Sequence, residues 1–162
     1  MSALTSPRLH YRPLGAEDVD VFHALVTDDH VRRYLLDGEL MPRAWAVDEI
    51  AASERLFMVQ RVGLWLVSDE DGVLGFCGFR VYAELEAHPH LLYALLPRGT
   101  GRGLATEMTG AMIAFADEVG FAPLRASVDE INAASVRVLE NTGFRLRETV
   151  GGAFGAMRIY ER

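Results

Sequence analysis

The chain has 162 residues, of which 50% are hydrophobic and 24% are charged. This length and composition predict a single domain spanning residues 1–162. Its net charge of −7 disfavours general nucleic-acid binding, which needs clustered cations against the phosphate backbone. No apolar run approaches the ~20 residues of a membrane helix, and the opening segment lacks the apolar stretch of a signal peptide. We therefore expect a cytoplasmic protein with neither a nucleic-acid nor a membrane partner.

Two residue types are scarce. Cys77 is the single cysteine, and the sixteen basic residues are all arginine. One thiol excludes an internal disulfide and a cysteine-based zinc site, and no metal site is predicted. The apolar surroundings of Cys77 favour a small buried side chain over a nucleophile. Without lysine, the chain cannot use a lysine base, a Schiff base or a phosphate-loop lysine.

The first half of the chain predicts one strand, then helices, then strands. Helical spacing of apolar residues and strand-like alternation distinguish the two types. Glu70-Asp71-Gly72 is a strong turn signal between two strands. The expected elements are a strand at 8–13, helices at 16–26, 29–36 and 44–60, strands at 63–69 and 73–83, a polar connection at 84–90, and a buried strand at 91–96.

The second half begins with the glycine-rich segment PRGTGRG. The elements expected after it are a helix at 104–119, a strand at 124–128, a short helix capped by Asn132 and running to Thr142, and strands at 144–150 and 154–160. Gly120 and Gly143 suit the left-handed position after a helix. The order predicts an α/β (α+β) fold, in which helices flank a mixed, mostly antiparallel sheet of six to seven strands.

The glycine-rich segment predicts a site for an anion. An apolar strand leads into glycines that open a helix, where backbone N–H groups are free and the helix dipole is positive. A pyrophosphate could be bound there without lysine. A nucleoside-triphosphatase loop is excluded, because it requires lysine. A dinucleotide-binding fold is excluded because Thr106 replaces its third glycine and the loop lies past mid-chain.

Residues 101–107, GRGLATE, resemble the acetyl-CoA loop of the GNAT acetyltransferases. They are similar to the G-x-G-Y-A-T-E of the subgroup related to ribosomal-protein N-terminal acetyltransferases. In one register Gly103 and Ala105 are the small residues of the motif, and Thr100 stands where the family has Gln or Arg. A second register uses Arg98, Gly101 and Gly103. The first also aligns Pro97 and the Ala-Thr-Glu segment, so we prefer it.

A second motif strengthens the resemblance, since a glycine-rich loop alone is often an ordinary turn. Residues 132–144, NAASVRVLENTGF, resemble the subgroup's N-x-x-S-x-(R)-x-L-E-x-x-G-F. They lie one helix and one strand after the loop, as in the family. Together the two motifs cover about a quarter of the chain. The resemblance implies a single GNAT domain that uses acetyl-CoA as acyl donor.

The resemblance also implies which residues bind acetyl-CoA. Backbone groups of the strand would bind the pantetheine arm, and loop amides and arginines would meet the phosphates. Asn132 would bond to the arm, although it also suits a helix cap. The implied set is Leu95, Leu96, Arg98, Gly101, Arg102, Gly103, Leu104, Ala105, Thr106, Asn132 and Ser135.

Two residues are implied as catalytic. Ser135 could protonate the leaving thiolate, or serve only as a second capping hydroxyl. Many relatives carry Glu seven residues before Pro97, where this chain has His90. Histidine suits a general base, because its ordinary pKa is about 6.5. Rivals for the base are Glu84, Glu86 and His88.

The resemblance implies transfer of acetyl from acetyl-CoA to a primary amine, either a protein N-terminus or a small amine, by direct attack in a ternary complex. The alternative is a degenerate domain that binds acyl-CoA as a sensor or interaction module. Acceptor-site candidates are the acidic residues Asp28, Asp29, Asp37 and Glu39 and the aromatic residues Tyr34, Trp45 and Phe154. The closing hairpin is the candidate surface for a homodimer.

Overall fold

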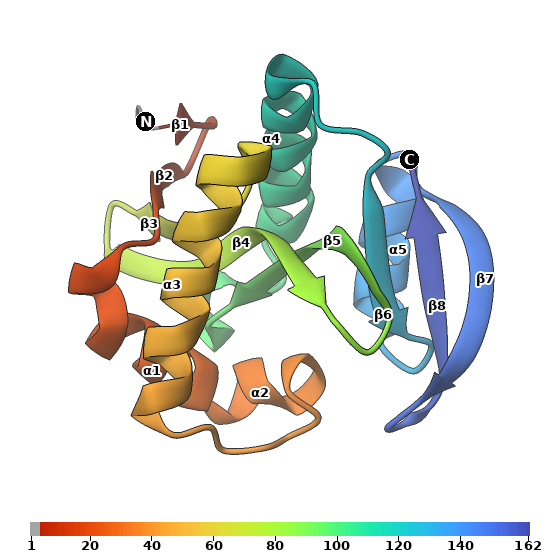
Figure 1. Cartoon of the computed structure of the whole chain (residues 1–162), viewed down its shortest axis with the longest axis horizontal. Coiled ribbons are helices and arrows are strands. Elements are labelled where there is room, and N and C mark those ends of the chain that lie inside the picture. Colours follow the sequence, from red (N-terminus) through yellow and green to blue (C-terminus); the bar gives the residue numbers. More distant parts are fainter. Residues whose placement is uncertain (1–3) are drawn as a thin grey trace.

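The computed structural model describes residues 4–162, which form one open sheet with helices on both faces (Figure 1). The strands are β1 (Leu4–Thr5), β2 (His10–Pro13), β3 (Leu64–Asp69), β4 (Gly72–Tyr82), β5 (Glu86–Leu95), β6 (Arg125–Asp129), β7 (Arg145–Gly152) and β8 (Gly155–Glu161). The helices are α1 (Val19–Thr27), α2 (Asp29–Leu35), α3 (Arg43–Gln60), α4 (Leu104–Val119) and α5 (Ala133–Asn141). None of these helices is long and apolar enough to cross a membrane.

The strand order in the sheet is β1-β2-β3-β4-β5-β6-β8-β7. Among the strands of residues 4–162, only β5 and β6 pair in parallel, through a crossover that contains α4. The mixed, mostly antiparallel sheet expected from the sequence is confirmed. Over residues 4–162 the sheet has eight strands rather than six to seven, because Leu4 and Thr5 pair with Tyr11 and His10 and add a short edge strand.

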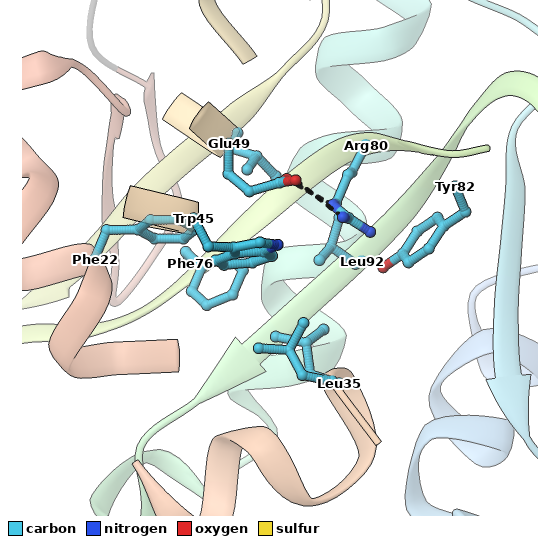
Figure 2. A pocket seen from close by; sticks show the side chains of 10 residues that line it. Phe22, Leu35, Trp45, Glu49, Phe76, Arg80, Tyr82 and Leu92 are labelled. Atoms are coloured by element: carbon cyan, nitrogen blue, oxygen red, sulfur yellow. Dashed lines mark hydrogen bonds and ion pairs between the residues drawn. The ribbon is translucent and has the colours of Figure 1, made fainter. Parts of the chain in front are cut away.

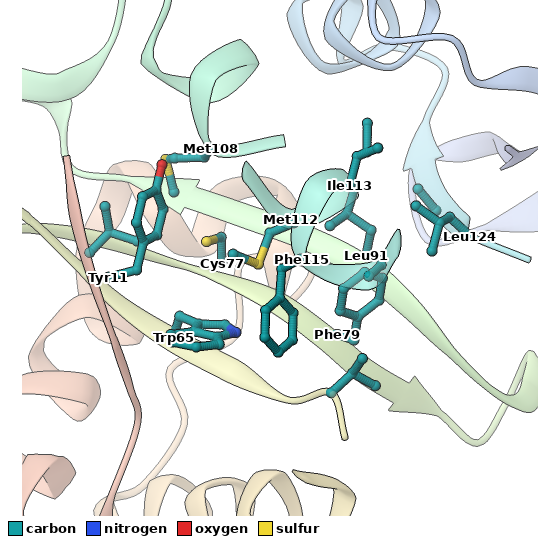
Figure 3. Close-up of a cluster of buried hydrophobic side chains, with 14 of the residues drawn as sticks. Tyr11, Trp65, Cys77, Phe79, Leu91, Met108, Met112, Ile113, Phe115 and Leu124 are labelled. Carbon is teal, nitrogen blue, oxygen red and sulfur yellow. The ribbon is translucent and has the colours of Figure 1, made fainter. Parts of the chain in front are cut away.

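Alternating side chains divide the core between the two faces of the sheet. On β3, Trp65 and Val67 pack toward α4, whereas Leu64 and Leu66 pack toward α1, α2 and α3. Figure 3 shows the α4 face, where Met108, Met112, Ile113 and Phe115 meet Trp65, Cys77, Phe79 and Leu91. Full burial of one such side chain is worth about 1.5–3 kcal/mol. The packing therefore fixes α4, and with it the loop at its N-terminal end.

Most element boundaries agree with the sequence prediction, and α4 has the predicted bounds. One prediction is wrong, because residues 86–90 belong to β5 rather than to a polar connection. The polar side chains there are paired across elements: Glu86 accepts from His90 and from Arg125 at 2.7 Å each. The first predicted helix also differs, since it opens with a 3-10 turn at Ala16–Asp18.

Candidate active site

A fork between two strands creates the main cleft of the described chain. β5 and β6 are in register only at His90 and Arg125. Beyond that pair, both strands line a cavity of about 980 Å³, together with the start of α4, α5, α2 and the tip of the β7–β8 hairpin. Leu91 and Val128 belong to the core on the α4 face, whereas Leu92 and Ala94 belong to the core on the α1–α3 face. The cleft thus meets both faces of the sheet.

The glycine-rich loop closes the α4 side of the cleft. Gly101 and Gly103 have left-handed φ angles of 72° and 75°, and Gly103 is the N-cap of α4 without a capping side chain. Within residues 4–162, the amides of residues 101–106 have no hydrogen-bond acceptor. Free amides at a helix start attract an anion. The loop therefore offers a site for an anion at the edge of the cleft.

Glu107, the last residue of the GRGLATE motif, fixes this loop to the N-terminal segment. Its carboxylate accepts from the Ser6 hydroxyl at 2.6 Å and from the Arg8 backbone N–H and Nε at 2.9 and 2.8 Å. Arg8 Nη1 also donates to the Arg102 carbonyl at 2.7 Å. Burial tends to raise the pKa of Glu107, but these hydrogen bonds outweigh it and lower the pKa. Glu107 thus supports the loop and leaves its amides free.

The two loop arginines predicted to meet phosphates contact Asp69 at the end of β3. Arg98 binds the Asp69 carboxylate at 3.0–3.1 Å and donates to the carbonyls of Gly72 and Val73. Arg102 lies 3.6 Å from the same carboxylate. The hydrogen bond from Arg98 lowers the pKa of Asp69. Neither arginine is among the residues that line the cleft.

The structure separates the two predicted pantetheine-binding leucines. The Leu96 N–H donates to Leu74 in β4 at 2.9 Å, and the Leu96 carbonyl accepts from Gly99 at 2.9 Å. Both backbone groups of Leu96 are therefore engaged, and this residue does not line the cleft. Because backbone groups alternate along a strand, those of Leu95 point to the opposite edge, toward β6. Leu95 is the member of the pair that lies at the open edge.

Asn132 and Ser135 lie on the α5 side of the cleft. Asn132 caps α5, since its Oδ1 accepts from the Ser135 N–H at 3.3 Å, and this leaves its Nδ2 group for a ligand. The Tyr93 hydroxyl reaches the Ser135 carbonyl at 3.5 Å. Burial raises the pKa of Tyr93 to about 12. The sequence prediction missed Tyr93, whose only signal is its place in the buried strand next to the loop.

His90, the predicted base, lies where the fork begins rather than in the cleft. Its side chain is 0% exposed, and Nε2 donates to Glu86 at 2.7 Å. Within the described chain Nδ1 has no partner. Burial lowers the pKa of His90, although the bond to Glu86 opposes this. His90 does not line the cleft, and its catalytic role stays a prediction.

The α2 side of the cleft carries acidic and aromatic side chains. Asp37, Glu84 and Asp129 line it, together with His30, Tyr34 and Tyr82. Asp129, at the end of β6, is only 8% exposed. Burial raises its pKa, and the negative charge of Asp37 adds to the effect. The sequence prediction included Asp37 and missed Asp129, which follows a strand in the acidic segment VDEIN and looks there like a solvated turn residue.

Figure 2 shows how Tyr82 is supported beside this part of the cleft. Arg80 forms two bonds to Glu49 of α3, at 2.7 and 3.0 Å, and its guanidinium carbon lies 4.6 Å from the Tyr82 ring centroid. Trp45 stacks at 5.8 Å on the same guanidinium and does not line the main cleft. Tyr34, which lines the cleft, meets the ring of Phe154 edge-on, with centroids 6.4 Å apart.

The geometry agrees with the family that the two motifs suggested. The model of the acetyltransferase (GNAT) domain matches residues 8–145. The chain belongs to the GNAT acetyltransferase family. Residues of the glycine-rich loop and of the α5 motif line the same cleft. No group of three or more His, Cys, Asp or Glu side chains that could hold a metal ion occurs in residues 4–162.

Similar proteins are acetyltransferases by name. An uncharacterized N-acetyltransferase p20 of Bacillus licheniformis is 25% identical over 169 residues, which cover 100% of this chain and 89% of the relative. A putative GNAT-family acetyltransferase from Bordetella pertussis has the same fold, with a TM-score of 0.86 at 23% identity over 100% of this chain and 99% of that one. A ribosomal-protein alpha-N-acetyltransferase solved with coenzyme A has a TM-score of 0.83 at 16% identity over 99% and 97%.

Proposed function

We propose that the chain transfers acetyl from acetyl-CoA to a primary amine, which attacks directly within a ternary complex. The observation that carries this proposal is the forked sheet with free loop amides on one side and acidic side chains on the other. An anionic donor and a cationic acceptor can thus approach the same gap from opposite faces. The family membership and the names of the relatives favour an enzyme over a non-catalytic binding module.

In this proposal the donor lies along the open edge of β5. The amides of Gly101–Thr106 hold the pyrophosphate, while Leu95 and Asn132 bind the pantetheine arm. Arg102, whose side chain is 45% exposed, can turn from Asp69 to a phosphate more readily than Arg98. A free N–H at the edge of β5 stabilises the oxyanion that forms when the thioester is attacked.

Direct attack is favoured over an acyl-cysteine because of where the thiol lies. Cys77 is fully buried in the core beneath α4, and burial raises its pKa far above the usual range. A buried thiol of this kind is not nucleophilic. Ser135, half-buried in the cleft, is the proposed proton donor to the leaving thiolate.

A cytoplasmic location follows from the intracellular donor, and the β7–β8 hairpin stays the predicted dimer surface.

The acceptor is a protein N-terminus or a small primary amine. The ribosomal-protein relative acts on a protein N-terminus by its name, and this supports the first class. The open mouth between α2 and the hairpin also admits a small amine.

Release of free thiol from acetyl-CoA tests the proposal. A panel of N-terminal peptides and primary amines should give amine-dependent release, and the same panel with blocked amines should give none. Saturable acetyl-CoA binding without release for any amine would instead support the binding-module alternative.

A further inference from the structure

Asp129 has the features of a group that meets a ligand. Asp129 as a whole residue is only 8% exposed, and it lines the cleft. Within residues 4–162 no hydrogen bond or ion pair contributes to the environment of its carboxylate, on which only burial and the charge of Asp37 act, although buried charges in proteins are usually paired. One carboxylate oxygen lies 3.5 Å from the position that a side chain on Gly152 would occupy. The glycine therefore leaves open the space beside this carboxylate.

Alternation along β6 gives the direction in which Asp129 points. Ala126 and Val128 belong to the core on the α4 face. Ser127 and Asp129 therefore face the other side of the sheet, toward α2 and the β7–β8 hairpin. Donor phosphates at the loop and an acceptor at Asp129 would thus lie on opposite faces of the fork.

The charges around Asp129 favour a cation. Asp37, at the end of α2, adds negative charge to the same space, and Glu84 lines it from the β4–β5 turn. Arg137 is the only arginine among the cleft-lining residues, and it lies on α5, on the donor side. His30 is the only other basic side chain there. A carboxylate on the acceptor would therefore meet repulsion without a compensating cation.

We infer that Asp129 and Asp37 form the acceptor-ammonium site, that Asp129 removes the proton from the attacking amine, and that the acceptor is a primary amine without a carboxylate beside it. This inference rests on the proposed transferase function. It gives the base role to a residue at the cleft rather than to His90 at the start of the fork.

The proton balance of the step is complete. Asp129 takes one proton from the ammonium, and the free amine attacks the acetyl carbon of the thioester. The C–S bond then breaks, and its electron pair leaves on sulfur. As the nitrogen becomes an amide it passes its second proton to the Ser135 hydroxyl oxygen, and the Ser135 hydroxyl delivers its own proton to the thiolate. The products are the acetamide and CoA thiol, and Asp129 releases its proton to water.

Binding to the CoA-saturated protein tests the site without requiring turnover. Leucinamide and leucine form a matched pair, since they differ only in a carboxamide against a carboxylate. Calorimetry should show at least about tenfold tighter binding of leucinamide, because like charges in such a site cost several kcal/mol. Asp129→Asn should weaken leucinamide binding by about tenfold or more while CoA binding is unchanged.

Glu130→Gln is the control, because it removes a negative charge one residue away, on an exposed side chain that pairs with Arg158 at 3.5 Å. It should leave both affinities within about twofold of wild type. In turnover, Asp129→Asn should lower kcat by about 100-fold or more and regain rate as the pH approaches the pKa of the amine. Asp37→Asn should weaken acceptor binding with a smaller loss of kcat.

Equal binding of leucine and leucinamide by the wild type, or unchanged leucinamide binding by Asp129→Asn, would overturn the inference. Charge-selective binding that Asp129→Asn abolishes would support the ammonium site even if no amine were acetylated. The absence of acetylation would count against the proposed acetyl transfer instead. The failures of the two proposals can thus be told apart.

Discussion

Replacing Gly103 by valine should weaken acetyl-CoA binding through backbone strain. Gly103 caps α4 with φ 75° and ψ 11°, in the left-handed region. A Cβ there would meet only Arg8 Nη2, at 3.6 Å, which is ordinary contact. The cost is therefore conformational, about 1–2 kcal/mol for an L-residue, and β-branched residues are among the least suited to this region.

That strain should fall mainly on the bound state. In the free protein the loop can relax and turn the amides of 104–106 away from the cleft, but a bound pyrophosphate requires the original geometry. A cost of about 1–2 kcal/mol corresponds to a Kd raised roughly 5- to 30-fold. Calorimetric titration with acetyl-CoA measures this change directly.

Gly110→Ala is the matched control. Gly110 lies inside α4, and a Cβ there meets nothing within 4 Å. Alanine should stabilise the helix by about 0.5–1 kcal/mol and leave the Kd for acetyl-CoA unchanged. A folded Gly103→Val protein that binds acetyl-CoA within about twofold of wild type would refute this role of the left-handed cap.

Three further predictions concern side chains at the fork. His90→Gln should reduce stability by about 1–3 kcal/mol in chemical denaturation, since it disturbs a buried hydrogen bond, and should change kcat by less than about threefold; a loss of 100-fold or more in a folded protein would restore His90 as the base. Asp129→Asn should raise the free energy of unfolding at pH 8 by on the order of 1 kcal/mol. Burial raises the pKa of Asp129 in the folded state, so ionisation lowers stability as the pH rises, and the gain should disappear only as the pH falls below the ordinary aspartate pKa of about 3.9; a less stable variant at pH 8 would contradict this reasoning. Ser135→Ala should lower kcat about 100-fold, and an unaltered kcat in thiol-release assays would exclude Ser135 as the proton donor.

The parts of the fold that sequence predicted well have local signals. The α4 bounds follow from an apolar stripe between Gly103 and Gly120, both of which are left-handed caps in the structure. Asn132 caps α5 because its side chain and the Ser135 amide are neighbours in sequence. The cofactor loop was predictable for the same reason, since its glycines and the first turn of α4 are contiguous.

The parts that were missed depend on distant contacts. The sequence of residues 86–90 looks like a polar connection, because nothing in it shows that Glu86 pairs with Arg125, 39 positions away. Asp129 looks like an exposed turn residue, and only the return of the hairpin at Gly152 and the approach of α2 enclose it. Leu96 appeared equivalent to Leu95 until the pairing with Leu74 fixed which backbone groups face β4. Sequence spacing does not contain this information.

Amide NMR spectra recorded with and without acetyl-CoA test most directly whether the fork and its loop bind the donor. We predict that the amides of Gly101–Thr106 and Leu95 shift and become protected from exchange as acetyl-CoA saturates the protein, whereas amides of α1 and α3 do not. Saturable binding that perturbs α1 or α3 and leaves residues 101–106 unchanged would contradict this account. So would the absence of binding at about millimolar acetyl-CoA, which means a binding free energy weaker than roughly −4 kcal/mol.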